Sequence, residues 1–390
     1  MFGLKTHSDR AIRLAAFAIV ALAAAPSQAL DEIAWLDLEG GLHLLTPDGN
    51  TAGTFADTQT VPGSSESNIF LVAYDRDKDG LDELIIGTTD ESRPSDIGLL
   101  VWDPKLNSGA GGVVVPSSNL NVISMPGIME HLGAIATINP EGTPREVVVQ
   151  GAINYHSSFT FLDGSARDAN NNIVADSTYG GWQVYDLDGN GADEIFYFRG
   201  TGLYYREYDG QANVDEVFYA NIPIPGGPFQ RWNFLLLIGD VDGDSEPDIL
   251  FGPPDPNDDG HMLVYYHPLL VPEGDLPLEV EDLIDSGMEI SRHAAPGGGR
   301  GGGGCLYTLG QMDADPQLEL LHINDDGWIA IIDLVDKTET VLNGVGPGVS
   351  NRENGEYSLT TAGYSALTTG NFSSTGGGEI PNRARHWSLY

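Results

Sequence analysis

A nine-residue acidic pattern recurs three times in this chain, and it constrains the fold more than any other feature. The copies span residues 75–83, 186–194 and 240–248 and read DRDKDGLDE, DLDGNGADE and DVDGDSEPD. Each copy has oxygen-bearing side chains at positions 1, 3, 5 and 9, and an apolar segment follows it. Apolar segments such as 69–74 and 234–238 also precede the copies. Because such internal repeats are typical of repeat architectures, we predict that the chain assembles similar β-units.

Three fainter copies share the same register and begin at residues 137, 311 and 371. Their oxygen-bearing positions are Thr137, Asn139, Glu141 and Glu146 (with one extra residue), Gln311, Asp313, Asp315 and Glu319, and Asn371, Ser373, Thr375 and Glu379. These copies carry fewer carboxylates than the three strong ones. We therefore expect most of them to be turns without a metal ion.

A second recurring element is a glycine-led apolar segment that ends in a turn. It occurs at residues 41–45, 98–103, 202–205, 260–266 and 327–332. The repeated unit is therefore a strand, an acidic loop, a second strand, a hairpin and two further strands, and no segment shows a helical period. This order predicts an antiparallel sheet of four strands for each repeat.

The two ends of the chain together complete one such unit. Asp31 and Glu32 resemble the tail of an acidic loop, a strand follows them, and residues 364–369 supply the missing first strand. The prediction is an all-β protein, a six-bladed β-propeller of four-stranded antiparallel blades closed by a blade shared between the termini, with seven blades as the alternative. Sharing a blade removes open sheet edges. Residues 30–380 would form this single domain, and residues 381–390 a C-terminal tail.

The three strong loops have the ligand chemistry that calcium requires, because calcium takes six to eight oxygen ligands at flexible distances. Side chains at positions 1, 3, 5 and 9 and the backbone carbonyl at position 7 would supply these oxygens. Gly80 and Gly191 at position 6 permit a sharp turn, whereas the third loop has Ser245 there. The predicted ligands of about three structural calcium ions are Asp75, Asp77, Asp79, Leu81, Glu83, Asp186, Asp188, Asn190, Ala192, Glu194, Asp240, Asp242, Asp244, Glu246 and Asp248.

Three other interpretations of the loops compete with calcium. Ordinary Asp/Gly turns between strands are the alternative to a metal site at any single loop. Zinc is disfavoured because no Cys or His joins the clusters. An EF-hand would need flanking helices and a glutamate at position 12.

With these loops described, the chain resembles the FG-GAP/VCBS repeat family, which includes the propellers of integrin α-subunits and many exported bacterial proteins. The resemblance covers nearly all of residues 31–380, and the loops at 75, 186 and 240 carry it. It implies that each loop joins the first two strands of a blade and binds calcium. It also implies a role in adhesion or ligand binding, but it does not fix an activity, since some propellers of this type belong to lyases.

Residues 1–29 have the three-part pattern of a secretory signal peptide. Lys5, Arg10 and Arg13 make the start basic, residues 15–25 are apolar, and small residues precede a predicted cleavage after Ala29. We expect a secreted, periplasmic or cell-surface protein with no transmembrane segment. The net charge of −39 disfavours nucleic acid as a partner. The single cysteine, Cys305, excludes an internal disulfide and is expected to be buried and inert.

The most consistent function is non-catalytic recognition or adhesion, with an extracellular protein or glycan as partner. A polysaccharide lyase is the second hypothesis, and it would draw on His131, Tyr155, His156, Arg231, Arg292 and His293. A structural component of an extracellular assembly is the third. Loop aromatics that could stack on sugars are Trp182, Phe229 and Trp232. The glycine-rich segment 297–304 lacks the Lys-Ser/Thr of a phosphate-binding loop and is expected to be a flexible linker.

Overall fold

The structure is a computed structural model, and every structural statement below refers to the residues that it describes. These are residues 30–36, 41–49, 59–60, 68–75, 80–89, 98–102, 110–116, 130–138, 145–152, 155–161, 172–174, 178–199, 202–207, 216–222, 235–253, 261–291, 307–324, 327–345 and 366–372. The predicted signal peptide (1–29), the glycine-rich segment 297–304, Cys305 and the predicted tail (381–390) lie outside them.

The described strands form six sheets, and three of these hold the two chain ends and the first part of the chain. The first sheet runs in the order β25 (Ala366–Gly370), β1 (Glu32–Leu36), β2 (Gly41–Leu45) and β3 (Gln59–Thr60). The second runs β4 (Asn68–Tyr74), β5 (Glu83–Thr89), β6 (Gly98–Trp102) and β7 (Ala110–Pro116). The third runs β8 (Glu130–Ile138), β9 (Arg145–Ala152), β10 (Tyr155–Phe161) and β11 (Asn172–Val174).

The other three sheets hold the rest of the described chain. One runs β12 (Thr178–Tyr185), β13 (Glu194–Arg199), β14 (Gly202–Glu207), β15 (Val217–Asn221) and β19 (Leu278–Glu279). The next runs β16 (Leu235–Gly239), β17 (Asp248–Gly252), β18 (His261–Pro268) and β20 (Ile284–Ser291). The last runs β21 (Tyr307–Gly310), β22 (Glu319–Ile323), β23 (Ile329–Asp333) and β24 (Thr338–Val341). Two short 3₁₀ turns, η5 (Glu273–Asp275) and η6 (Val280–Asp282), flank β19.

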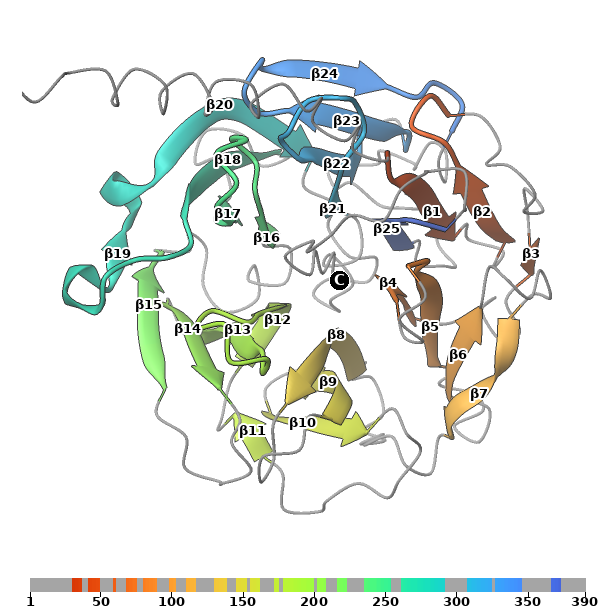
Figure 1. The fold of residues 1–390 in the computed structure, drawn as a ribbon, viewed down its shortest axis with the longest axis horizontal. Coiled ribbons are helices and arrows are strands. Elements are labelled where there is room, and N and C mark those ends of the chain that lie inside the picture. Colours follow the sequence, from red (N-terminus) through yellow and green to blue (C-terminus); the bar gives the residue numbers. More distant parts are fainter. Residues whose placement is uncertain are drawn as a thin grey trace, which may run out of the picture.

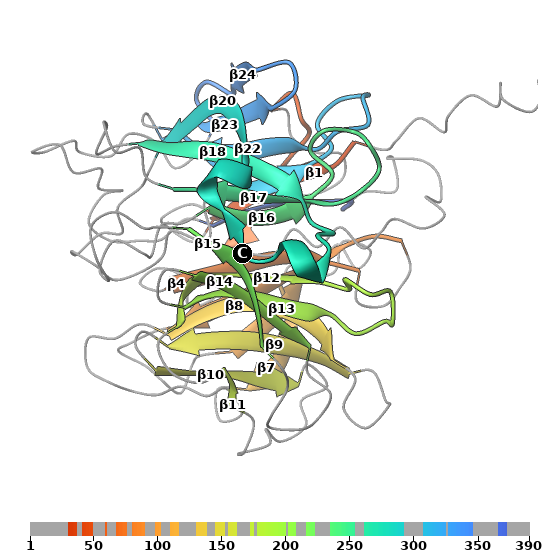
Figure 2. The ribbon, with the colours of Figure 1, turned by 90° about the vertical axis from the view of Figure 1, so that its left-hand side faces the viewer.

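The sheets are arranged around a common centre, and the first strand of each sheet is the innermost one (Figure 1). Successive first strands contact one another, from β4 to β8, β12, β16, β21 and β25, and β25 contacts β4 again. In the side view, strands β22–β24 lie at the top of the molecule and β9–β11 at the bottom (Figure 2). The prediction of an all-β protein is therefore confirmed.

Both chain ends contribute to one sheet, as the sequence predicts. Strand β25 pairs antiparallel with β1, with Ala366 opposite Leu36 and Gly370 opposite Glu32. The C-terminal segment supplies one strand of this sheet and the N-terminal part supplies three. The register places Asn371 and Phe372 next to Asp31 and Glu32, so residues from the two ends lie where other sheets have one continuous loop.

The prediction of four antiparallel strands in every sheet is wrong for one sheet. There, β19 adds a fifth strand that runs parallel to β15. It belongs to the segment between β18 and β20, which crosses from the neighbouring sheet. Leu269 and Leu278 on this segment are buried, and the Tyr219 hydroxyl donates to the Leu269 carbonyl at 2.9 Å. Apolar burial and this bond hold the segment over the edge of β15 and cover that edge.

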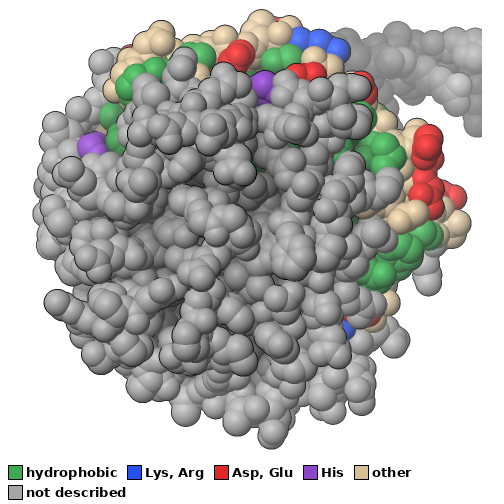
Figure 3. Space-filling view, turned by 180° about the vertical axis from the view of Figure 1, so that it is seen from behind, with side chains coloured by type: hydrophobic (Ala, Val, Ile, Leu, Met, Phe, Trp, Pro, Cys, Tyr) green, Lys and Arg blue, Asp and Glu red, His purple; other side chains and the backbone are tan. Residues whose placement is uncertain are grey.

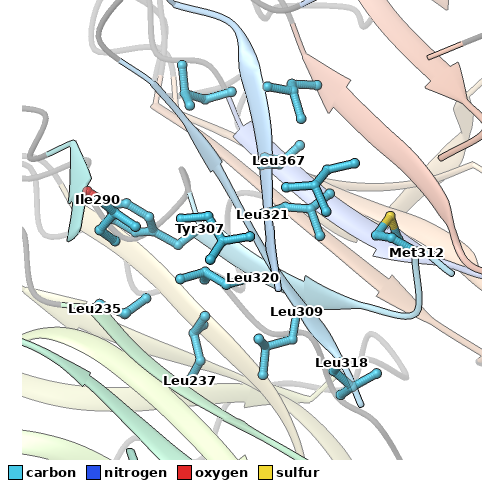
Figure 4. Close-up of a cluster of buried hydrophobic side chains, with 14 of the residues drawn as sticks. Leu235, Leu237, Ile290, Tyr307, Leu309, Met312, Leu318, Leu320, Leu321 and Leu367 are labelled. Atoms are coloured by element: carbon cyan, nitrogen blue, oxygen red, sulfur yellow. The ribbon is translucent and has the colours of Figure 1, made fainter. Parts of the chain in front are cut away.

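Much of the described core lies between neighbouring sheets, as the two faces of β16 show. All five residues of β16 are buried, and its alternate side chains enter different clusters. Leu235 and Leu237 pack towards Tyr307 and Leu309 of the next sheet (Figure 4). Leu236 and Ile238 pack with Phe196 and its neighbours on the other side. Burying each such side chain stabilises the fold by roughly 1.5–3 kcal/mol.

No helix among the described residues is both long and apolar enough to cross a membrane. In the view from behind, acidic side chains lie among hydrophobic ones at the top and right edges (Figure 3).

Candidate cation-binding loops

The three acidic loops whose residues are fully described share their hydrogen bonds at positions 3, 5 and 9. They are 186–194, 240–248 and 311–319, and each joins the first and second strands of its sheet. This placement follows from the sequence pattern, in which an apolar strand stands on each side of the loop. The third of these loops is one of the faint copies, which the sequence predicts to share the register of the strong ones but mostly to lack a metal ion.

Position 1 forms the sharp turn of the strong loops. Oδ2 of Asp186 accepts a hydrogen bond from the Gly191 N–H, and Oδ2 of Asp240 accepts one from the Ser245 N–H, both at 2.9 Å. Gly191 has a φ of +88°, so the predicted role of glycine at position 6 holds there. Ser245 adopts a φ of +74° without being glycine, a conformation that costs about 1–2 kcal/mol for an L-residue. The bond to Asp240 helps to hold it.

Positions 3 and 5 continue the turn by accepting backbone N–H groups two residues further on, as Asp and Asn do in Asx turns. The side chain at position 3 accepts from the backbone of position 5, and the side chain at position 5 accepts from that of position 7. The donor–acceptor pairs are Asn190–Asp188 (3.0 Å), Ala192–Asn190 (2.7 Å), Asp244–Asp242 (3.2 Å), Glu246–Asp244 (2.8 Å), Asp315–Asp313 (2.9 Å) and Gln317–Asp315 (3.1 Å).

Position 9 brings a buried carboxylate under each loop. Glu194, Asp248 and Glu319 are 5%, 2% and 2% exposed. Each accepts the N–H of position 2 of its own loop, from Leu187 at 2.6 Å, Val241 at 3.1 Å and Met312 at 2.6 Å. The second strand of each sheet begins at this residue, so strand pairing fixes the carboxylate beneath the turn.

Burial dominates the electrostatics of these three carboxylates. Desolvation raises the pKa of Glu194 to about 7, of Asp248 to about 7 and of Glu319 to about 8. Neighbouring acidic residues of the same loop add to each rise, while the backbone N–H bonds oppose it. A negative charge at position 9 is thus unfavourable in the protein alone and would become favourable beside a cation.

Carboxylate oxygens converge in all three loops. Within each group the oxygens lie within 4.8 Å of one another, and the groups are Asp188, Glu194 and Glu207, then Asp240, Asp242 and Asp244, then Asp313, Asp315 and Glu319. The groups offer oxygen ligands alone, which suits a hard cation such as calcium better than zinc or copper. Oδ1 of Asp186 and Oε1 of Glu319 are buried and have no hydrogen-bond partner among the described residues. Buried oxygens of this kind fit a bound cation.

The structure places the predicted ligands as follows. In loop 186–194 it brings together Asp188 and Glu194, with Asp186 bonded to the turn beside them. In loop 240–248 it brings together Asp240, Asp242 and Asp244, and Asp248 lies buried below. In loop 75–83, Asp77 and Asp79 lie outside the described residues. Oδ2 of Asp75 accepts the Gly80 N–H at 3.0 Å, Leu81 is half-buried, and Glu83 is 3% exposed.

Ala192 and Glu246 stand at position 7 and are predicted to offer carbonyl ligands. Their backbone N–H groups donate to the side chains at position 5, which fixes the backbone there. Their side chains differ, since Ala192 is buried and Glu246 is exposed. Because position 7 accepts side chains as different as Ala and Glu, a role for its backbone carbonyl is consistent with the structure.

Sequence reasoning missed one carboxylate in this cluster, Glu207. It ends β14, where strand pairing sets it opposite Glu194. Asp333 ends β23 in the same way. Burial is the largest cause of the raised pKa of Asp315, and the charges of Asp313 and Asp333 add to it. An acidic residue at the end of the glycine-led strand is visible in the sequence at 103, 207 and 333. This recurrence could have indicated the additional carboxylate.

A second candidate surface is a row of aromatic side chains across β13, β14 and β15. The rings of Tyr204 and Phe218 stack with centroids 4.9 Å apart, and Tyr197 stacks on Tyr204 at 6.2 Å. Phe218 is 36% exposed at the outer end of this row. A Cβ at Gly202 would lie 2.5 Å from Phe218, so only glycine lets this ring fold back over β14.

Charged groups stand beside the inner end of the aromatic row. Arg206 and Glu216 form an ion pair at 3.0 Å. The Tyr197 hydroxyl donates to Glu216 and accepts from Nε of Arg206 at 3.2 Å. Burial is the main cause that raises the pKa of Tyr197, and the hydrogen bond to Glu216 is the second. The row therefore combines an exposed apolar ring with fixed charges, which suits a ligand with one apolar and one polar face.

None of the residues proposed for a lyase has a described side chain. His131 lies in β8 and Tyr155 and His156 lie in β10, where only the backbone is described. Arg231, Arg292 and His293 lie outside the described residues, as do Phe229 and Trp232. The prediction that Trp182 lies in a loop is wrong, since it lies within β12, and its side chain is likewise not described.

Comparisons with known proteins give only distant likenesses. No family model matches the chain, and no curated protein matches it. A solved lectin from Agrocybe aegerita, described as recognising non-reducing terminal N-acetylglucosamine, is 12% identical, with a TM-score of 0.40 over 89% of this chain and 96% of the lectin. A complex of the fission yeast SREBP–SCAP binding domains is 13% identical, with a TM-score of 0.26 over 65% of this chain and 68% of that one. At these TM-scores neither likeness carries an inference.

Proposed function

We propose that the six sheets are the blades of a six-bladed β-propeller built from FG-GAP/VCBS-like repeats. The cycle of contacts between first strands and the sheet shared by β25 and β1 support this assignment. The position of each described acidic loop between the first and second strands supports it further, since this is the position that the family resemblance implies.

In this proposal, calcium ions occupy loops 186–194 and 240–248 and, by sequence likeness, loop 75–83. The single observation that carries the proposal is the recurrence of one hydrogen-bonding geometry with converging carboxylates and a buried position-9 acid. Loop 186–194 would use Asp188, Glu194 and Glu207, with Oδ1 of Asp186 as a further oxygen. The ion would be structural, because it neutralises clustered charges and fixes the turn between two strands.

The protein would act as an exported, non-catalytic recognition module for a glycan or a protein. The aromatic row of Tyr197, Tyr204 and Phe218 supports a ligand with an apolar face, because it exposes the Phe218 ring at its outer end and has the Arg206–Glu216 ion pair at its inner end. The net charge of −39 argues against acidic partners such as nucleic acid. A structural role in an extracellular assembly is the alternative in which no soluble ligand binds.

A binding experiment with two matched variants tests this function. The protein is applied in calcium to arrays of glycans and of extracellular proteins. We expect binding that Phe218→Ala weakens about tenfold, a loss typical of an aromatic contact. Leu270→Ala is the control, since Leu270 is 51% exposed and lies outside the row. Excess chelator should abolish binding, and added calcium should restore it.

Other results would redirect the proposal. Unaltered binding by Phe218→Ala would remove the aromatic row from the recognition surface. Unsaturated products released from acidic polysaccharides would replace recognition by the lyase hypothesis. If no assay detects binding or turnover while the calcium-loaded protein is folded, a structural role in an extracellular assembly would be favoured.

A further inference from the structure

The segment 30–36 docks on loop 311–319 through Asp31. The Asp31 N–H donates to the Gln311 carbonyl at 2.8 Å, and Oδ2 of Asp31 accepts the Gln311 N–H at 3.0 Å. Both partners are buried, at 6% and 2% exposed. Two reciprocal bonds in a buried setting fix the start of β1 against the position-1 residue of this loop.

The same two bonds recur between other neighbouring sheets. Asp82 exchanges them with Asn371 (2.7 Å and 2.7 Å), and Asp193 exchanges them with Thr137 (2.7 Å and 2.5 Å). In each case an aspartate at position 8 of one loop holds position 1 of the loop in the preceding sheet. The recurrence makes the Asp31–Gln311 contact part of the architecture, and it makes position 1 the point through which a loop holds its neighbour.

Gln311 also reaches into its own loop. Its Nε2 donates to the carbonyl of Asp313 at 3.0 Å and to the carbonyl of Asp315 at 2.7 Å. In the other fully described loops position 1 is an aspartate, whose carboxylate accepts from position 6 instead. The carboxamide therefore ties the backbone that holds Asp31 to Asp313 and Asp315, two of the three residues that offer carboxylates in this loop.

The carboxylate group of this loop contains a buried oxygen that lacks a partner among the described residues. Asp313, Asp315 and Glu319 bring oxygens within 4.8 Å of one another. Glu319 is 2% exposed, and its Oε2 accepts the Met312 N–H, whereas its Oε1 has no hydrogen-bond partner there. A buried carboxylate with one oxygen lacking a donor, on a residue grouped with two other carboxylates, points to a cation as the missing partner.

We propose that loop 311–319 binds a divalent cation such as calcium through Asp313, Asp315 and Glu319, and that this ion locks the segment 30–36 in place. The ion would order the two residues to which Gln311 is bonded, and Gln311 holds Asp31. This proposal extends the proposed calcium function to a loop whose sequence is degenerate. With a neutral residue at position 1, the site should bind calcium more weakly than loops 186–194 and 240–248.

Hydrogen exchange on the full chain tests this lock. Amide exchange of Glu32–Leu36 is measured in chelator and in calcium at about ten times the dissociation constant of the weakest ion, with magnesium alone as a further arm. We expect calcium to slow exchange of these amides about tenfold, because a ligand stabilises the state that it binds in proportion to its saturation.

Two pairs of neutral variants separate this site from the others. Glu319→Gln keeps the acceptor for Met312 but removes the charge, and Glu194→Gln makes the matched change in loop 186–194. Asp313→Asn and Asp188→Asn form an exposed pair, which serves if a buried variant does not fold. We expect the changes at 319 and 313 to abolish the calcium-dependent slowing at Glu32–Leu36, and those at 194 and 188 to preserve it.

The outcomes distinguish the two proposals. Full calcium-dependent slowing at Glu32–Leu36 in Glu319→Gln or Asp313→Asn would overturn the lock and leave the other calcium loops standing. Equal loss in the matched variants of loop 186–194 would also overturn it, because the effect would then be global. If calcium changes exchange nowhere in the unaltered chain, the proposed calcium function fails first and the lock fails with it.

Discussion

At the residue scale, the position-9 acid decides how each loop responds to its surroundings. Glu194, Asp248 and Glu319 are almost fully buried, and each accepts a backbone N–H from position 2. Neutral backbone donors do not replace all the water that a carboxylate loses on burial, so the charged form is disfavoured. A cation in the loop reverses this preference, because it attracts the ionised form.

The first prediction follows from these pKa values and concerns the metal-free protein. The folded-state pKa values are about 7, 7 and 8, above the ordinary values of 4.5 for Glu and 3.8 for Asp. A raised pKa contributes stability that is fully present below the unfolded-state pKa and is lost as pH rises through the folded-state pKa. In chelator, the free energy of unfolding should fall as pH rises from about 4.5 to about 8, by up to about 1.4 kcal/mol per pH unit for each of these groups.

Denaturant unfolding across this pH range measures the effect. In saturating calcium the decline should shrink, so that the stabilisation by calcium grows as pH rises. Glu319→Gln should remove the upper part of the decline, near pH 8, because that residue has the highest of the three values. A metal-free stability that rises between pH 5 and pH 8 would contradict the account of these buried acids.

At the element scale, neighbouring acidic loops are in contact with one another. The Leu318 N–H of loop 311–319 donates to the Asp240 carbonyl at 2.9 Å. Gly243 has a φ of +80°, and a Cβ there would lie 2.9 Å from Oε1 of Gln317 and 3.1 Å from Cγ of Pro316. Loops 240–248 and 311–319 therefore form one packed unit at the ends of their first strands.

The second prediction compares the two glycines at position 4. Gly189 has a φ of +74°, and a Cβ added there would meet no described atom within 4 Å, whereas Gly243 faces the next loop. Gly189→Ala should cost about 1 kcal/mol, the strain of the left-handed conformation. Gly243→Ala should cost about 1 kcal/mol more, because the neighbouring loop must also move. If denaturant unfolding shows the same loss of stability for both variants, loops 240–248 and 311–319 are not tightly packed against each other.

The elements also show how far the sequence could predict this molecule. The acidic loops, the strands around them and the sheet shared by the chain ends were all visible as patterns, because they follow local periodicity and spacing. The fifth strand β19 was not, since two residues that pair with a distant edge leave no periodic pattern. Glu207 joined the cluster through strand register, which spacing along the chain does not reveal.

The partner of Phe372 shows the same limit. The sequence pattern assigned position 9 of the last loop to Glu379, whereas the Phe372 N–H donates to Glu32 at 2.9 Å, as position 2 donates to position 9 elsewhere. Glu379 itself lies outside the described residues. Glu32 belongs to the loop tail that the sequence predicts at residues 31–32, and the pairing of β25 with β1 brings it to this position. The dipeptide Asp-Glu at 31, 82 and 193 was the available clue.

At the scale of the whole molecule, the chain must hold six sheets together without a disulfide and with a net charge of −39. Apolar packing between sheets supplies one source of cohesion, as in the cluster around Leu235 and Leu320. The position-8 aspartates supply a second by bonding one sheet to the next. Calcium would supply a third, since repulsion among clustered carboxylates opposes folding unless a cation offsets it.

Thermal unfolding of the full chain, in calcium and in chelator at pH 7.5, tests this central claim most directly. Saturating calcium at about one hundred times its dissociation constant adds about 2.7 kcal/mol for each ion, so the midpoint should rise by at least about 5 °C. Asp240→Asn and Glu194→Gln should each reduce that rise. A midpoint that is the same in millimolar calcium and in chelator would contradict the proposal that these loops stabilise the fold by binding calcium.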